Sequence, residues 1–241
     1  NFLKNLKRFD VIFRSPGMPW NLPELRAARK NGACFSSATK LFFETAGKIG
    51  ATIIGVTGTK GKGTTATLIY KILRTAGVDA YLAGNIGKSP LTILPKLARR
   101  SVVVLELSSF QLQDLKCSPD IAVVLDIFPD HQDAHLNLKE YYEAKTNIAR
   151  HQKKTDKIFF FKNHTLSRWV AAKSRARKYP INESGFALFA SENLKIRGLH
   201  NFKNAVMAAE VARAFKIPER TILRVAKNFN GLEHRLEFVR S

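Results

Sequence analysis

The amino-acid sequence predicts an α/β protein with a mainly parallel sheet flanked by helices. Beyond residue 50, short apolar stretches alternate with segments of helical periodicity, which is the order that builds a parallel sheet. Two stretches, 102–107 and 121–125, are continuous apolar runs, typical of strands covered by helices on both faces. A glycine-rich segment, 55–65, joins an earlier apolar run, 51–56, to a helix. A chain of 241 residues with 45% hydrophobic content can bury such a core.

The N-terminal part of the chain predicts a separate, smaller unit. Val11-Ile12-Phe13 is a short apolar strand, and Ser15-Pro16-Gly17 after it is a turn signal. A helix then begins near Pro23, with apolar residues on one face. Residues 1–46 therefore resemble the last β/α units of a small α/β domain, and residues 47–237 form the main domain.

The elements of the main domain follow in order along the chain. Strands are short runs of β-branched, aromatic or aliphatic residues, and helices repeat apolar residues at intervals of three and four. Strands are predicted at 52–57, 80–83, 102–107, 121–125, 157–161 and 186–189. Helices are predicted at 64–76, 138–151, 165–174, 201–216 and 219–228.

The glycine-rich segment carries the clearest chemical signal. It reads Gly55-Val56-Thr57-Gly58-Thr59-Lys60-Gly61-Lys62-Gly63-Thr64-Thr65. Glycines at a strand-to-helix turn let backbone N–H groups converge on phosphate oxygens, and the helix dipole and the Lys62 charge add to the attraction. The alternative is a glycine-rich turn with an exposed lysine. The predicted nucleotide-contacting residues are Gly58, Thr59, Lys60, Gly61, Lys62, Gly63, Thr64 and Thr65.

This loop departs from the usual pattern at one position. A Ser or Thr normally follows the lysine and places its hydroxyl on Mg²⁺, but this chain has Gly63 there. Thr64 follows at once, so we expect Thr64 to supply the hydroxyl after a shift of one residue.

Polar residues follow the strands, at the edge of a parallel sheet where ligands bind. Glu106 ends an apolar strand and is either a magnesium ligand or a solvated rim carboxylate. His131 lies on the loop after 121–125, where a structural role is favoured over a metal-binding one, because magnesium prefers oxygen ligands. Lys145 lies near the buried edge of its helix, and a snorkelling lysine is the simpler interpretation. Asn201 is either a helix N-cap or, with Asn204, a reader of a purine edge.

Composition limits the partners. The net charge of +21, from 40 Lys and Arg against 19 Asp and Glu, attracts nucleic acid or phosphorylated small molecules. The basic residues are scattered, without the aromatic–basic alternation of an RNA-binding sheet, so no nucleic-acid partner is expected. No apolar run is long enough to span a bilayer, and two cysteines make no disulfide framework, which predicts a cytoplasmic protein without a membrane partner. The start, Asn1-Phe2-Leu3-Lys4, resembles the middle of a longer protein.

Seven short sequence phrases between residues 55 and 237 resemble the Mur ligase family, and within it the D-glutamate-adding branch. They occur along the chain in the same order as in the family. Two of them are Pro129-Asp130-His131 and Glu143-Ala144-Lys145. The phrase that indicates the branch is Glu106-Leu107-Ser108-Ser109-Phe110-Gln111-Leu112. The remaining phrases are Gly55–Thr65, Gly84-Asn85-Ile86-Gly87, Gly198-x-His200-Asn201-x-x-Asn204 and Gly231-Leu232-Glu233-His234-Arg235-Leu236-Glu237.

The resemblance implies a cytoplasmic, monomeric ligase of peptidoglycan precursor synthesis. It would join D-glutamate to UDP-N-acetylmuramoyl-L-alanine with ATP, through an acyl phosphate, by positioning and charge neutralisation. Residues 47–237 would be a phosphate-loop ATPase domain, and 1–46 the remnant of a Rossmann-like domain that binds the UDP substrate. Residues 238–241 would begin a third domain. Because the chain ends there, it is expected to bind nucleotide with weak or no ligation.

The resemblance also implies roles for single residues. Lys62, His131 and Lys145 would be catalytic, with Lys62 on the β- and γ-phosphates. Two Mg²⁺ sites would be held by Thr64, Glu106, His131 and a carbamylated Lys145. Nucleotide would contact His200, Asn201, Asn204 and Arg235, and substrate would contact Asn85 and Ser108.

Two other functions fit parts of the sequence. Another Mur or folylpolyglutamate-type ligase would share the phosphate loop, although the phrase at 106–112 argues against it. A nucleic-acid-stimulated phosphate-loop ATPase would use the positive charge. Gly63 and Asp126, which stands where an asparagine is more familiar, are the departures from the family pattern.

Overall fold

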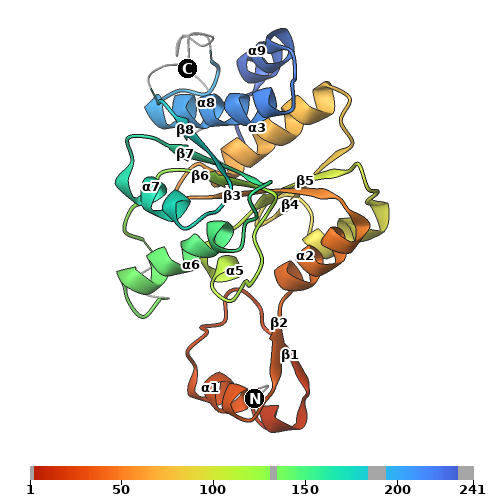
Figure 1. The fold of residues 1–241 in the computed structure, drawn as a ribbon, viewed down its shortest axis with the longest axis vertical. Helices are drawn as coiled ribbons and strands as arrows, with labels where there is room; N and C mark the ends of the chain where they lie inside the picture. Colours follow the sequence, from red (N-terminus) through yellow and green to blue (C-terminus); the bar gives the residue numbers. More distant parts are fainter. Residues whose placement is uncertain (1–2, 131–134, 184–193, 233–241) are drawn as a thin grey trace, which may run out of the picture.

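A computed structural model describes residues 3–130, 135–183 and 194–232, and it contains two parallel sheets (Figure 1). The large sheet has six strands in the order β4-β5-β3-β6-β7-β8, and the small one pairs β1 with β2. The strands are β1 Val11–Phe13, β2 Cys34–Ser36, β3 Thr52–Thr57, β4 Ala80–Gly84, β5 Val102–Glu106, β6 Ile121–Val124, β7 Lys157–Phe161 and β8 Arg177–Ile181. The helices are α1 Pro23–Lys30, α2 Ala38–Ile49, α3 Lys62–Thr75, α4 Pro90–Ile93, α5 Ser109–Leu112, α6 Leu138–Arg150, α7 Thr165–Ala172, α8 Leu199–Ala214 and α9 Glu219–Asn228.

Helices cover both faces of the large sheet, as the continuous apolar runs predict. In Figure 1, α3, α8 and α9 lie on one face, and α2, α5, α6 and α7 lie on the other. Side chains alternate between two cores: Ile54 and Val104 pack under α3 and α8, whereas Ile53 and Val103 pack under α2 and α6. Every residue of β5 and β6 is buried. The predicted mainly parallel, helix-flanked sheet is confirmed.

The strand order changes direction at β3. From β3 the chain moves to one side for β4 and β5, and then to the other side for β6, β7 and β8. The chain leaves β3 for α3 on one face of the sheet, whereas it leaves the neighbouring strands β5 and β6 for α5 and α6 on the other face, which is the arrangement in which ligands bind to open α/β sheets. Glu106 pairs in register with Val56, so its side chain reaches the same edge as the glycine-rich loop.

Several elements were not predicted from the sequence. The edge strand β8 contains Arg177, Lys178 and Pro180, a composition that a strand tolerates only at an edge. The strand predicted at 186–189 lies outside the described residues. The long helix α2 was missed, and the predicted domain boundary at 46/47 falls inside it. Its buried Phe42 and Ala46 pack into the core of the large sheet.

Arg14 joins the small N-terminal unit to the large sheet's helical layer. Its side chain is 1% exposed and pairs with Asp114, which is 8% exposed, at 3.0 Å. The same guanidinium donates to the carbonyl oxygens of Phe110, at 3.0 Å, and Met18, at 2.8 Å. Removing one partner of such a buried ion pair lowers the stability of the fold, because the other charge is left buried and unpaired.

We predict that Arg14→Met lowers the free energy of unfolding by about 3–5 kcal/mol, because Asp114 is left as a buried, unpaired carboxylate. Chemical denaturation followed by circular dichroism measures this change. The control is Arg74→Ala, which removes an exposed pair with Asp79 at 3.9 Å and should change stability by less than about 1 kcal/mol. Equal losses in the two variants would contradict the structural role of Arg14.

Candidate functional site

The loop between β3 and α3 has a backbone that only glycine adopts readily. Gly58 and Gly61 have φ angles of +157° and +80°. A Cβ at Gly61 would collide with the side-chain amide of Asn204 on α8, and one at Gly58 would lie 2.7 Å from Leu125 Cβ. The loop therefore passes against α8 and the end of β6 with no room for a side chain.

Lys62 starts α3, two residues earlier than predicted, and folds back over this loop. Its Nζ donates to the carbonyl oxygens of Thr59, at 2.9 Å, and Gly58, at 3.2 Å. The ammonium group thus lies at the mouth of the loop, beside the N-terminal end of α3, where an anion is favoured.

Thr59 fastens the loop to the elements that follow β6. Its N–H donates to the carbonyl oxygen of Asp126 at 2.8 Å. Its hydroxyl oxygen accepts from the N–H of Phe128 at 2.8 Å and lies 2.9 Å from the phenol oxygen of Tyr141 on α6. These contacts hold the loop rigidly between β6 and α6.

Lys145, also on α6, points into the same loop. Its side chain is 2% exposed, and its Nζ donates to the carbonyl oxygen of Gly58 at 2.8 Å. Burial, and then the charge of Lys62, lowers the pKa of Lys145 to about 7 from the ordinary 10.5. The snorkelling interpretation is therefore wrong, because the ammonium group is turned inward to the loop and away from water.

Glu106 faces the first turn of α3 from the end of β5. It is 2% exposed, and its Oε2 has no hydrogen-bond partner among the described residues. That oxygen would lie 3.2 Å from a Cβ placed on Gly63. The alternative of a solvated rim carboxylate is wrong, since a buried carboxylate oxygen needs a donor or a cation. In the same turn of the helix, Thr64 is 8% exposed.

The two residues predicted to contact substrate flank Glu106. The N–H of Asn85 donates to the carbonyl oxygen of Glu106 at 3.2 Å, after Gly84 has turned the chain with a φ of +111°. Ser108 caps α5: its hydroxyl accepts from the N–H of Gln111 at 3.3 Å, and the Gln111 side chain accepts from the N–H of Ser108 at 2.9 Å. The phrase that indicated the D-glutamate branch thus forms a capping box.

The start of α8 brings the amide residues to the loop. Asn204 is 5% exposed and lies against Gly61. The prediction of Asn201 as N-cap is wrong: α8 begins at Leu199 after Gly198, and Asn201 donates its amide to the carbonyl oxygen of Arg197 at 2.9 Å. His200 lies in the same first turn. The predicted roles of these residues toward a nucleotide stay predictions.

Two predicted site residues, His131 and Arg235, lie outside the described residues. In the parts of the chain that the structure describes, no three His, Cys, Asp or Glu side chains gather as a metal site. The structure thus brings Lys62, Lys145, Glu106 and Asn204 to one loop.

Sequence reasoning missed an ion-pair cluster beside this loop. Lys203 on α8 pairs with Asp126 at 3.2 Å and with Glu183 at 2.5 Å. Burial alone would lower the pKa of Lys203, but the hydrogen bonds and charges of the two carboxylates together raise it. Asp126 was noticed as a departure from the family pattern, but its partner lies 77 residues away, and no spacing rule connects them.

A sheet of parallel strands with a lysine-bearing glycine loop between its central strand and a helix defines a phosphate-loop α/β protein. The model for the Mur ligase middle domain matches residues 56–193, and the chain belongs to the Mur ligase family. The family resemblance predicted from the sequence is confirmed.

Relatives and solved structures agree with this assignment. The chain is 39% identical to the UDP-N-acetylmuramoylalanine–D-glutamate ligase of Ruminiclostridium cellulolyticum, over 100% of this chain and 55% of that protein. It is 38% identical to the ligase of the same name from Symbiobacterium thermophilum, over 99% and 57%. The chain thus spans about half the length of these relatives.

The fold is also found in solved structures. The MurF ligase of Thermotoga maritima, in complex with ADP, superposes with a TM-score of 0.64 at 17% identity, over 97% of this chain and 69% of that one. The UDP-N-acetylmuramate:L-alanyl-gamma-D-glutamyl-meso-diaminopimelate ligase of Neisseria meningitides gives 0.67 at 18% identity, over 96% and 82%. Within the described ranges, no helix combines the length and apolar character needed to cross a bilayer.

We predict that Lys145→Met stabilises the fold at pH 7 by up to about 4–5 kcal/mol, because lowering the pKa of a buried amine from 10.5 to about 7 costs roughly 1.4 kcal/mol per unit. Between about pH 7 and 10.5 the unfolded chain binds more protons than the folded one, so wild-type stability rises with pH. The difference between the variant and wild type should therefore shrink across this window. The carbonyl oxygen of Gly58 keeps Lys62 as a donor in the variant.

Urea titrations between pH 6 and 10, in CO₂-free buffer, measure this difference. The exposed Lys139→Met on the same helix is the control, and it should show no such trend. A difference between Lys145→Met and wild type that stays constant with pH would show that Lys145 is not the titrating group.

Proposed function

We propose that this chain is the nucleotide-binding centre of a ligase that joins D-glutamate to UDP-N-acetylmuramoyl-L-alanine with ATP. The observation that carries the proposal is the convergence of two ammonium groups and one buried carboxylate on a glycine loop at the carboxyl edge of the sheet. The names of the relatives supply the substrates. Residues 1–46 would be the part of the UDP-substrate-binding domain that lies next to this centre.

The triphosphate of ATP would lie along residues 58–65. Backbone N–H groups of the loop and of the first turn of α3 would donate to its oxygens, and Lys62 would leave its loop carbonyls for the β- and γ-phosphates. Asn204, which lies against Gly61, would contact the adenine base. His200, Asn201 and Arg235 would contact the same nucleotide. These assignments rest on the family likeness and on the position of α8.

The donor set fits Mg²⁺. The buried Glu106 Oε2 lacks a hydrogen-bond partner among the described residues, and a hard carboxylate oxygen is the ligand that Mg²⁺ prefers. Thr64 would add a hydroxyl, and His131 with a modified Lys145 would hold a second ion. Bound there, Mg²⁺ would neutralise phosphate charge.

A carbamate on Lys145 has a physical basis in this site. With a pKa of about 7, a substantial share of the amine is uncharged at neutral pH, and the uncharged amine is a nucleophile. Its nitrogen would bond to the carbon of CO₂ and lose a proton, which converts an unfavourable buried cation into an anion beside Lys62. The same lysine charge that lowers the pKa of Lys145 would stabilise that anion.

The chain's own residues would act mainly by position and charge. Asn85 and Ser108 would orient the UDP-substrate so that its carboxylate oxygen bonds to the γ-phosphorus and ADP leaves. The D-glutamate nitrogen then bonds to the carbonyl carbon of the acyl phosphate, phosphate leaves, and the nitrogen loses a proton. Lys62 would balance the charge on the transferred phosphoryl group throughout.

We expect a polypeptide with these residues at the full length of the relatives to release ADP from ATP only when UDP-N-acetylmuramoyl-L-alanine and D-glutamate are both present. A coupled ADP assay measures this release. Lys62→Ala should lower kcat/KM at least about 100-fold, because the phosphoryl charge loses its cation. Arg74→Ala, at the far end of α3, is the control and should be unchanged. Equal turnover with L-lysine, or stimulation by DNA, would favour one of the alternative functions.

We predict that Gly63→Ser strengthens the Mg²⁺ dependence of ATP binding about five-fold, since it restores a hydroxyl beside Glu106. The new Cβ would lie 3.0 Å from Leu232 Cδ1, the mobile end of a side chain that can give way. Calorimetric titration with ATP, in Mg²⁺ and in EDTA, measures the effect. Gly63→Ala adds the Cβ without the hydroxyl and should leave the dependence unchanged. The same gain in both variants would mean that helix stabilisation, and not metal ligation, is responsible.

A further inference from the structure

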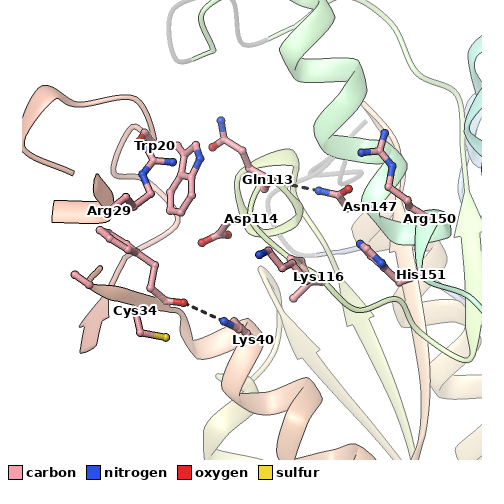
Figure 2. Close-up of a pocket in the computed structure, with 13 residues that line it drawn as sticks. Trp20, Arg29, Cys34, Lys40, Gln113, Asp114, Lys116, Asn147, Arg150 and His151 are labelled. Carbon is pink, nitrogen blue, oxygen red and sulfur yellow. Dashed lines mark hydrogen bonds between the residues drawn. The ribbon is translucent and has the colours of Figure 1, made fainter. Parts of the chain in front are cut away.

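A cavity of about 610 Å³ lies between the N-terminal unit and the layer of α5 and α6 (Figure 2). Trp20, Arg29 and Cys34 line one side, Lys40 from α2 lies below, and the segment 113–116 with the end of α6 lines the other side. Its size is in the range of small-molecule sites, about 300–1,000 Å³. None of its lining residues belongs to the nucleotide site described above.

Most of the charged side chains in the lining are cations. Four basic side chains and one carboxylate line the cavity: Arg29, Lys40, Lys116, Arg150 and Asp114. The carboxylate is already paired with a buried arginine, Arg14, at 3.0 Å. The cavity therefore has an excess of positive charge.

The hydrogen bonds of these cations leave most of that charge uncompensated. Lys40 donates to the carbonyl oxygen of Phe35 at 3.0 Å, and Arg29 to that of Trp20 at 3.0 Å. Carbonyl oxygens orient a cation but carry no net charge. Arg150 has an acidic partner, Glu143, at 2.6 Å, where both side chains are exposed and the pair is screened. The charges of Glu44 and Lys40 both act on Cys117, so Glu44 offsets part of the positive charge near Lys40.

The positive charges around the cavity also contribute, after burial, to two lowered pKa values. Burial, together with the charges of Arg150 and Lys116, lowers the pKa of His151. Burial and the charges of Arg26 and Arg14 lower the pKa of Arg29, although Asp114 opposes them. A chain with 40 Lys and Arg has many basic surfaces, but here cations from separate segments face one concave space.

We propose that this cavity binds a small phosphorylated molecule, held between Arg29 and Lys40 on one side and Lys116 and Arg150 on the other. Arginine and lysine together are the side chains that recognise phosphate oxygens. A ligand with two phosphate groups can contact both sides, so pyrophosphate should bind more tightly than inorganic phosphate. Such a ligand would bridge the N-terminal unit and the helical layer of the large sheet, independently of the proposed ligase reaction.

The experiment uses Trp20 as the reporter. The chain has two tryptophans, and the other, Trp169 on α7, does not line the cavity. In a Trp169→Phe background, titration with pyrophosphate should change the Trp20 fluorescence with saturation. Lys116→Ala with Arg150→Ala should raise the Kd at least about ten-fold, because two charge-assisted contacts are lost. Lys139→Ala with Lys154→Ala removes two exposed charges elsewhere and is the matched control.

Two other causes of a fluorescence change are tested in parallel: pyrophosphate binding at the phosphate loop, and a general effect of ionic strength. Lys62→Ala in the same background should leave the pyrophosphate Kd within about two-fold, whereas a lost response would assign the binding to the phosphate loop. Sodium chloride at equal ionic strength should have no saturable effect. Lys40→Gln tests the opposite side of the cavity should the double variant fail to fold. An unchanged Kd in both cavity variants, or tighter binding of a short single-stranded DNA than of pyrophosphate, would overturn the proposal.

Discussion

Two lysine ammonium groups meet on one carbonyl oxygen, that of Gly58, and the rest of the site depends on this contact. Lys145 reaches it from α6 at 2.8 Å and Lys62 from α3 at 3.2 Å. Burial, and then repulsion by the charge of Lys62, disfavours the ammonium form of Lys145 and lowers its pKa to about 7. Anions placed at this loop would relieve this repulsion. The fold therefore holds two positive groups together at a cost in stability, and the resulting site favours negatively charged ligands.

Neighbouring helices and strands leave no room for side chains at the glycines around this contact, in addition to any requirement for phosphate binding. Gly61 leaves room for Asn204, and Gly63 faces Glu106 and Leu232. Each glycine therefore marks a place where α3 meets another element, α8 in one case and β5 in the other. For this reason the loop, the start of α8 and the end of β5 form one unit: a shift of any of them would close the space in which the buried carboxylate lies.

The sequence predicted the sheet and the loop well because both are local patterns. Continuous apolar runs identify β5 and β6, and glycines with a lysine between a strand and a helix identify the turn. Contacts between residues far apart in the sequence could not be predicted from these patterns. The burial of Lys145 depends on Gly58, 87 residues away, so the local pattern favoured a snorkelling side chain. The edge strand β8 was missed because its charged residues and proline lack the apolar pattern of a strand. Asn201 looked like an N-cap because Gly198, which fills that place, has no capping side chain.

The unusual Asp126 illustrates how such long-range contacts explain a departure from a family pattern. Its backbone carbonyl oxygen accepts from Thr59 in the loop, and its side chain pairs with Lys203, one residue before Asn204 on α8. An amide at this position would make a neutral hydrogen bond, whereas a carboxylate makes a charge-assisted one, which is roughly twice as strong. Glu183 holds the same lysine from the segment after β8. The ion pair between Asp126 and Lys203 therefore fixes the start of α8 against the phosphate loop.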